Sequence, residues 1–280
     1  MSATTEVPAP ITPDAVETSE ARRVLNLSLT LAASEFKMRY FGSVLGYFWT
    51  LARPLLLFGV LYLAFTHFIR FGGGIDFYPA YLLTAIVLWT YFSDVTSVSV
   101  TSLVAHESLI RKMPMPLLVI PVSISMTAFL NLCLNLIAVL VFIFLSGVHP
   151  TIDWLQFPFL VAGLALYAAA VGSLVANLYV PFRDMKPIWE VVLQGLFWGT
   201  PIIYTIEAVP ESVKQLIMFN PLSVVTTQMR HSVIDQSAPT ATTAIGGIEW
   251  MAVPGAIVLV TFGASLLLYR RYAPRIAERL

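Results

Sequence analysis

The chain has 280 residues, of which 58% are hydrophobic and 11% are charged. Soluble domains carry about 25% charged residues, so this composition excludes a soluble globular protein and predicts an all-α integral membrane protein. The 16 basic and 16 acidic residues balance, which argues against nucleic acid as a partner. The single cysteine, Cys133, excludes a disulfide framework.

Two N-terminal segments precede the first apolar run. The first 19 residues contain prolines and carboxylates but lack the basic and apolar parts of a signal peptide, so we expect a flexible cytoplasmic tail. In residues 20–47, apolar residues that include Phe36 and Tyr40 recur every three or four positions, whereas Lys37 and Arg39 lie elsewhere on the helical wheel. This pattern predicts an amphipathic interface helix. Its basic residues either anchor the helix or contact the head group of a lipid substrate.

Six segments between residues 48 and 269 are apolar enough to cross a membrane. We expect spans at about residues 51–69, 77–100, 117–147, 154–182, 187–203 and 251–269. Six crossings put both termini on one side, where residues 270–280 form a basic tail. Of the 16 Lys and Arg, only Arg70, Lys214 and Arg230 would then lie on the other side. This asymmetry predicts cytoplasmic termini.

Polar and small residues within the spans indicate where helices meet. Asn131 and Asn135 lie four residues apart on one helix face, so we expect them to bond to a neighbouring helix. The fourth span carries two stripes of small residues, which favour close helix contact. One consists of Ala165, Ala169 and Ser173, and the one beside it of Ala168, Gly172 and Ala176.

The segment from residue 204 to residue 250 contains no window long enough to span, because prolines and charged residues interrupt it. It is nevertheless too apolar for a simple loop. We expect two short helices, broken at Asn220 and Pro221, that dip into the outer leaflet. An interfacial outer hairpin would have the same sequence signature.

Four segments carry a family resemblance: RYFGSVLGYFWTLARPLL before the first span, ESLIRKMPMP after the second, YVPFRDMKPI after the fourth and NPLSVV before the last. They resemble the corresponding segments of ABC-2 type permeases that export polysaccharides, the Wzm and TagG group. The similarity extends over about residues 25–275. Within this group, the acidic, proline-rich tail is most similar to that of galactan exporters of mycobacterial-type cell walls.

The resemblance implies a homodimeric permease in the cell membrane, each copy docked on a separate, Wzt-like ATPase subunit. Mg-ATP would bind to that partner, so no cofactor, metal or catalytic residue is expected in this chain. Consistent with this division, the sequence has no GxxxxGK[ST] phosphate loop. The implied substrate is a polysaccharide linked to polyprenyl diphosphate, with galactan as the first choice and O-antigen or teichoic acid polymers as alternatives.

The resemblance also assigns roles to residues on the two cytoplasmic connectors. A coupling helix over residues 102–112 would contact the ATPase, and the loop before the fifth span would add lesser contacts. The expected coupling residues are His106, Glu107, Ser108, Leu109, Ile110, Arg111 and Lys112, with Arg183, Asp184 and Lys186 on the second loop. An ordinary charged loop is the competing interpretation of the first connector.

In this family the first and fifth spans would form a lateral gate. Arg53 and Glu190 lie near the cytoplasmic ends of these spans, and their similar depth predicts a pair. Aromatic residues would line the pore and stack on sugars, and residues 204–250 would cap its outer mouth. The candidate pore aromatics are Trp89, Tyr91, Phe92, Phe197, Trp198 and Tyr204. Interfacial anchoring or core packing would explain the same aromatics.

Three other functions stay open at the level of sequence. An ABC-2 permease for drugs or small lipids would share the spans and the ATPase but would not need the interface helix. A polyprenyl-dependent membrane glycosyltransferase would need a catalytic domain or paired aspartates, whereas Asp94, Asp153 and Asp184 are widely spaced. A proton-coupled transporter would show internal repeats and carboxylates at the membrane midplane.

Overall fold

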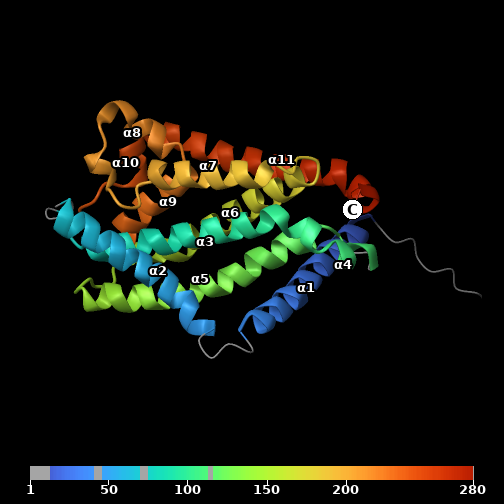
Figure 1. Ribbon diagram of the computed structural model, residues 1–280. Helices are drawn as coiled ribbons and strands as arrows, with labels where there is room; N and C mark the ends of the chain where they lie inside the picture. Colours follow the sequence, from blue (N-terminus) through green and yellow to red (C-terminus); the bar gives the residue numbers. More distant parts are fainter. Residues whose placement is uncertain (1–12, 41–45, 70–74, 113–115, 280) are drawn as a thin grey trace, which may run out of the picture.

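The computed structural model describes residues 13–40, 46–69, 75–112 and 116–279 (Figure 1). Within these ranges all regular secondary structure is helical, which confirms the expected all-α class. The first 12 residues of the predicted tail lie outside the described part. The side chains of residues 13–21, 38–40, 46–47, 111–112 and 272–279 also lie outside it.

Eleven α-helices are present in the described ranges. They are α1 (Pro13–Tyr40), α2 (Gly46–Leu63), α3 (Tyr78–Ala105), α4 (Glu107–Lys112), α5 (Val119–Leu145), α6 (Phe157–Tyr179), α7 (Met185–Gly199), α8 (Glu211–Met218), α9 (Pro221–Met229), α10 (Ala241–Ile245) and α11 (Ala252–Arg279). Five short 3₁₀ or π segments extend or join them, namely η1 (Ala64–Phe68), η2 (Ile152–Gln156), η3 (Ile206–Ala208), η4 (Arg230–Ile234) and η5 (Ile248–Met251).

Five helical stretches are long and apolar enough to cross a membrane. They are Phe48–Phe68, Tyr78–Ala105, Val119–Leu145, Ile152–Tyr179 and Ile248–Arg271. The expected span at 187–203 is instead the 15-residue helix α7, which is about 22 Å long at 1.5 Å per residue. The hydrocarbon core of a bilayer is about 30 Å thick, so α7 alone is shorter than a full crossing. The protein is a multi-pass integral membrane protein.

The backbone after α7 is irregular from Thr200 to Thr205 and is held by two tyrosines of α3. The hydroxyl of Tyr78 donates to the carbonyl oxygen of Ile203 at 2.7 Å, and that of Tyr81 lies 3.0 Å from the carbonyl oxygen of Tyr204. Backbone carbonyls at membrane depth need such partners because no water can supply them. The tyrosines thus explain how α7 can end early.

Helix α3 is the centre of the bundle, packed against α2, α5, α6 and α7. Its closest neighbour approaches at Gly172 of α6, where an added Cβ would lie 2.8 Å from Oγ of Ser99. Ala168 and Ala176, one turn to either side, are fully buried. The predicted stripe of Ala168, Gly172 and Ala176 is therefore confirmed as a contact surface between α6 and α3.

Helix α1 packs along α5 through small residues. Ser28 and Ala32 are buried, and Oγ of Ser28 lies 3.4 Å from the carbonyl oxygen of Val119. The apolar residues Leu25 and Leu29 stay 48% and 51% exposed, which leaves an apolar stripe for lipid. The prediction of a flexible tail up to residue 19 was wrong from Pro13 onward, because a proline in the first turn and nearby carboxylates favour a helix N-terminus.

The two ends of the bundle differ in construction. At one end lie α4, part of α1 and the C-terminal part of α11, whereas α8 and α10 lie at the other (Figure 1). The predicted break at Asn220 and Pro221 is confirmed, since α8 ends just before it and α9 begins at Pro221. The side chain of Asn220 caps α9 by accepting a hydrogen bond from the backbone N–H of Leu222 at 3.1 Å.

Candidate functional site

The short helix α4 is fixed to the bundle by one apolar residue. Ile110 is buried in a small cluster with Leu103 of α3 and with Leu117, Ile120 and Ile124 at the start of α5. This cluster is separate from the main core around α3. A movement of α4 would therefore be transmitted to the ends of α3 and α5.

The other expected coupling residues leave a polar surface on α4. Ser108 is exposed, and Glu107 and Leu109 are half-buried. The backbone N–H groups of Leu109 and Ile110 both donate to the carbonyl of His106 at 3.0 Å. Arg111 and Lys112 belong to the helix, but their side chains lie outside the described residues.

The second loop lies at the same end of the molecule. Val180, at the end of α6, packs against the cluster that holds Ile110. Arg183, Asp184 and Lys186 follow it and are exposed. The guanidinium of Arg183 stands 5.1 Å from the ring centroid of Tyr179, a cation–π distance that orients this arginine. The two predicted coupling segments therefore lie at the same end of the bundle.

Helix α1 is connected to the turn before α4 by an ion pair. Oε1 of Glu35 lies 3.4 Å from Nε2 of His106, and this contact raises the pKa of His106 despite partial burial. Phe36 is half-buried and Lys37 is exposed, while the side chains of Arg39 and Tyr40 lie outside the described residues. The sequence analysis did not single out Glu35, although it directly precedes Phe36 in the expected interface helix.

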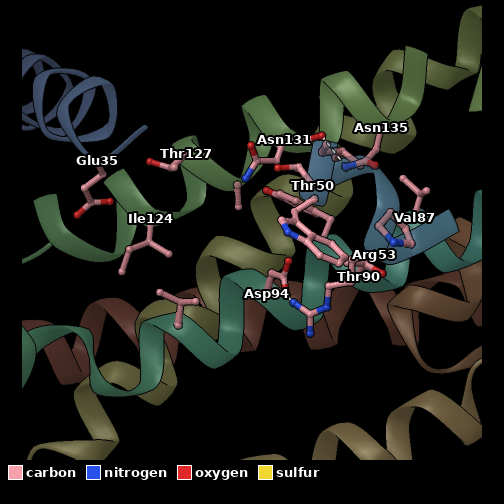
Figure 2. Close-up of a pocket in the computed structure, with 16 residues that line it drawn as sticks. Glu35, Thr50, Arg53, Val87, Thr90, Asp94, Ile124, Thr127, Asn131 and Asn135 are labelled. Atoms are coloured by element: carbon pink, nitrogen blue, oxygen red, sulfur yellow. Dashed lines mark hydrogen bonds and ion pairs between the residues drawn. The ribbon is translucent and has the colours of Figure 1, made fainter. Parts of the chain in front are cut away.

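A cavity of about 400 Å³ opens between α1, α2, α3 and α5 (Figure 2). Glu35 lies at one end of it and Asn135 at the other, with Arg53 and Asp94 between them. Its polar lining residues are Glu35, Thr50, Arg53, Thr90, Tyr91, Asp94, Thr127, Asn131 and Asn135. A second hollow of about 290 Å³ shares Glu35 and Thr127 with it and reaches His106. The two hollows adjoin at Glu35 and Thr127, beside the interface helix.

The predicted pair of Arg53 and Glu190 is not made within one copy of the chain. Nη1 of Arg53 instead lies 3.5 Å from Oδ1 of Asp94 on α3, while Glu190 is exposed on α7. The prediction rested on similar depth in the membrane, and depth does not specify the side of the helix on which each residue lies. Asn135 also departs from the prediction, because it donates to the carbonyl of Asn131 on its own helix at 2.9 Å.

The aromatic candidates divide into core and surface residues. Phe92 is 0% exposed and stacks on Tyr167 with ring centroids 5.5 Å apart, so its assignment to a pore was wrong. Trp89 is buried and packs edge-on against Phe197 at 5.4 Å. These rings fill the core because α3 is covered on nearly every side.

The remaining aromatics lie at the cavity or at the surface of the protein. Tyr91 lines the cavity of Figure 2, and Trp198 is 61% exposed. Tyr204 is half-buried, and its hydroxyl donates to the carbonyl of Trp198 at 2.9 Å. Of the six candidates, Tyr91 is the one that borders the described cavity.

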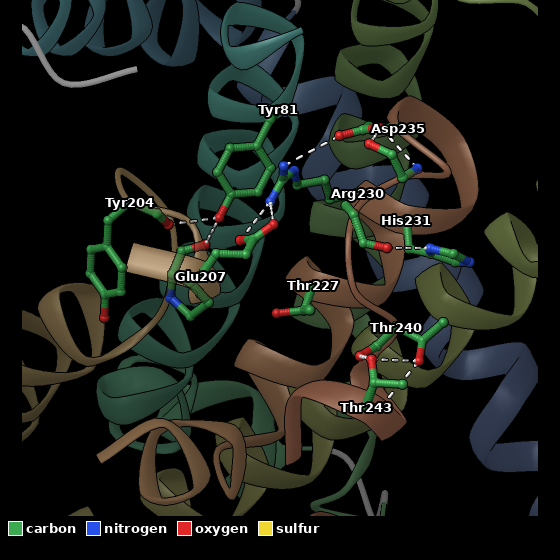
Figure 3. A network of polar contacts seen from close by, with 12 residues as sticks. Tyr81, Tyr204, Glu207, Thr227, Arg230, His231, Asp235, Thr240 and Thr243 are labelled. Atoms are coloured by element: carbon green, nitrogen blue, oxygen red, sulfur yellow. Dashed lines mark hydrogen bonds and ion pairs between the residues drawn. The ribbon is translucent and has the colours of Figure 1, made fainter. Parts of the chain in front are cut away.

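The outer segment is locked by a buried arginine (Figure 3). Nη1 of Arg230 donates to both carboxylate oxygens of Glu207 at 2.7 and 2.8 Å, and Nη2 lies 3.3 Å from Asp235. The guanidinium also stands 5.5 Å from the ring centroid of Tyr81 on α3. Such a network makes the outer segment a rigid cap that is tied to the central helix.

Comparison with known proteins agrees with this architecture. Residues 27–234 match the family model described as ABC-2 type transporter. The chain is 29% identical over 201 residues to the O-antigen export system permease protein RfbA of Klebsiella pneumoniae, covering 71% of this chain and 77% of that protein. It is 30% identical over 198 residues to the protein of the same name from Myxococcus xanthus, covering 70% and 75%.

A third relative comes from another export system. The chain is 22% identical over 241 residues to the polysialic acid transport protein KpsM of Escherichia coli, covering 84% of this chain and 89% of that protein. The region that the family model matches includes Glu35 of α1 and all of α2 to α5, and therefore the lining of the cavity and helix α4. Taken with the multi-pass helical fold, these matches show that the chain belongs to the ABC-2 type transporter family of membrane proteins.

Proposed function

We propose that this protein is the permease subunit of an ABC exporter that moves a polyprenyl diphosphate-linked polysaccharide across the cell membrane. The observation that carries the proposal is the similarity, over 70% or more of the chain, to proteins named for the export of two different polysaccharides. The two adjoining hollows between α1, α2, α3 and α5 support it, since a lipid-linked substrate would arrive at the interface helix.

The energy for export would come from a separate ATPase subunit that binds Mg-ATP. Helix α4 suits the coupling role because Ile110 anchors it while Ser108 faces outward. Arg183, Asp184 and Lys186 would make the lesser contacts from the second loop. The packing of Ile110 favours this role. A helix that packs against α3 and α5 would move together with them, whereas a flexible loop would change its own conformation instead.

The working unit would be a homodimer with the conduit between two copies. Exposed apolar residues on α2 and α7, such as Leu56 at 61% and Val191 at 68%, provide surfaces that a second copy or lipid would cover. Arg53 and Glu190 would then approach each other across the two copies. Arg53→Cys combined with Glu190→Cys should give a disulfide-linked dimer, and failure to crosslink in every nucleotide state would contradict this gate.

The orientation follows from the charge asymmetry of the sequence. The end with α4 and the second loop would face the cytoplasm, together with both termini. The cap that contains α8 and α10 would face outward, where Arg230 holds it against α3. Such a cap is suited to close the outer mouth between transport cycles.

Galactan for cell-wall assembly is the substrate that we place first. This choice rests on the resemblance of the acidic, proline-rich tail, while the relatives are named for O-antigen and polysialic acid. Expression of the gene in strains that each lack the exporter of one defined glycan would test the choice. Restoration of O-antigen or teichoic acid export, but not of galactan export, would contradict it.

The function itself is tested by isolating the protein from native membranes. We expect an ATPase subunit and a lipid-linked glycan to copurify with it, and depletion of the protein should cause that glycolipid to accumulate on the cytoplasmic face. A deletion of residues 22–40 should abolish export. Intact export of a small lipid by the deleted protein, with no effect on glycan, would favour a drug or lipid permease instead.

A further inference from the structure

The cavity of Figure 2, called the chamber below, is a partly open hollow in a single copy, lined by both polar and apolar side chains. Four helices contribute to it: Glu35 lies on α1, Arg53 on α2, Asp94 on α3 and Asn135 on α5. Polar and charged side chains within spans are expensive and mark functional sites by default. Its volume of about 400 Å³ lies in the range of about 300–1,000 Å³ that small-molecule sites occupy.

The charges in this chamber do not favour a phosphate group. Asp94 lies 3.5 Å from Arg53, and Glu35 lies 3.4 Å from His106 in the adjoining hollow. Each described carboxylate of the lining therefore faces a cation, and the described lining carries no surplus positive charge. A diphosphate needs such a surplus, whereas neutral hydroxyl groups can bond to both members of an ion pair.

The neutral groups in the lining suit a sugar. The amide of Asn135 uses one N–H to bond Asn131, and an amide has a second N–H and an acceptor oxygen for a ligand. Tyr91 is only 5% exposed, and its hydroxyl has no hydrogen-bond partner in the described part of the chain. The ring of Trp49, which is 58% exposed, provides a flat apolar surface for the C–H face of a sugar.

We infer that this chamber binds sugar units of the transported glycan within each copy, before the glycan enters the conduit between copies. The inference rests on the proposed function and adds the binding site and its residues. Asn135, Tyr91 and Thr90 are the residues that would contact sugar hydroxyls. The diphosphate would stay outside the chamber, at the membrane surface near the interface helix.

The test uses a pair of matched asparagine variants. Asn135→Leu removes an amide from the chamber, and Asn177→Leu removes a buried amide outside it, which also donates to the carbonyl four residues earlier at 2.9 Å. Tyr91→Phe removes the unpartnered hydroxyl, with Tyr167→Phe as its control outside the chamber. Losing an unsatisfied hydroxyl leaves stability unchanged or higher, so a loss of binding in Tyr91→Phe cannot be attributed to unfolding.

The full permease–ATPase complex would be titrated with a polyprenyl diphosphate-linked disaccharide and with polyprenyl phosphate that carries no sugar. We expect Asn135→Leu and Tyr91→Phe each to weaken disaccharide-lipid binding about threefold to tenfold. Neither control should change it, and polyprenyl phosphate should bind all variants equally. Unchanged disaccharide-lipid binding in both chamber variants would overturn the inference, as would an equal loss for polyprenyl phosphate.

Failure of the proposed function gives a different result. In that case the wild-type complex would neither bind nor export the disaccharide lipid. The free disaccharide would then be titrated against the wild type and Asn135→Leu. Weaker binding by the variant would still support a sugar site, and equal or absent binding would overturn it.

Discussion

Nε2 of His106 lies 3.4 Å from the carboxylate of Glu35, so an ion pair joins the interface helix α1 to the turn that precedes α4. Nδ1 of the same ring lies 2.8 Å from the carbonyl oxygen of Ser102. A carbonyl oxygen only accepts, so Nδ1 carries a proton, and Nε2 needs a second proton to donate to Glu35. The imidazole is therefore charged when both contacts are made, and the segment that would receive substrate is tied to the one that would receive force.

This pair predicts that α1 docks less firmly as the pH rises. The hydrogen bond to Glu35 raises the pKa of His106 above its ordinary value of 6.5. The stabilisation is therefore complete below about pH 6.5 and is lost as the pH rises through the raised pKa. Unfolding in detergent should show the wild type about 1 kcal/mol more stable than Glu35→Gln at pH 6, with the difference shrinking toward zero at pH 9. A difference that is constant with pH would contradict the charged pair.

The close contact between α6 and α3 predicts that Gly172→Ala destabilises the protein. A Cβ there would lie 2.8 Å from Oγ and 3.2 Å from Cβ of Ser99, and such overpacking costs about 1–3 kcal/mol. Ser99→Ala should relieve part of the loss. The matched control is Gly163→Ala on the same helix, where an added Cβ meets nothing within 4 Å. Equal melting temperatures for Gly172→Ala and Gly163→Ala would show that the helices have room to separate.

The outer cap should depend on Arg230. Arg230→Met leaves Asp235 buried without its cation, and removal of one partner from a buried pair costs about 3–5 kcal/mol. The control is Glu211→Gln, which breaks the ion pair with Lys214 but affects a carboxylate whose side chain is 87% exposed, so its cost should stay below about 1 kcal/mol. Proteolysis of the outer segment and thermal unfolding would measure both effects. Similar behaviour of the two variants would refute the locking role.

Helix α4 should couple to the ATPase through its charged residues. Replacing Glu107 and Arg111 with alanine should weaken ATPase binding, or allow ATP hydrolysis without export, while the permease still folds. The control is Ser212→Ala, which alters an exposed residue of α8, at the opposite end of the molecule from α4. Copurification and ATPase activity of the reconstituted complex would be measured. Normal export by the double variant would refute the coupling assignment.

The sequence predicted features that depend on local signals. The apolar runs gave five of the six expected spans to within five residues, and the asparagine–proline pair marked the break before α9, because hydropathy and helix breakers act within one segment. Contacts between segments were not predicted in the same way. Arg53 meets Asp94 instead of Glu190, since depth along a helix does not specify which side a residue faces.

The candidate site shows the same division. The two connectors that the sequence placed on one side of the membrane do lie at one end of the bundle, because each follows an even-numbered expected span. Phe92 lies in the core instead of a pore, and the part played by Glu35 was missed. Both depend on how α1, α3 and α6 pack together, and an amphipathic pattern on one helix contains no information about its neighbour.

The central claim is that this chain is a conduit driven by another subunit. Vesicles that contain a fluorescent polyprenyl diphosphate-linked glycan would be prepared with the permease alone, with the ATPase alone and with both. The account predicts ATP-dependent transfer of the glycan across the bilayer only when both subunits are present. Transfer against a gradient by the permease alone would contradict it.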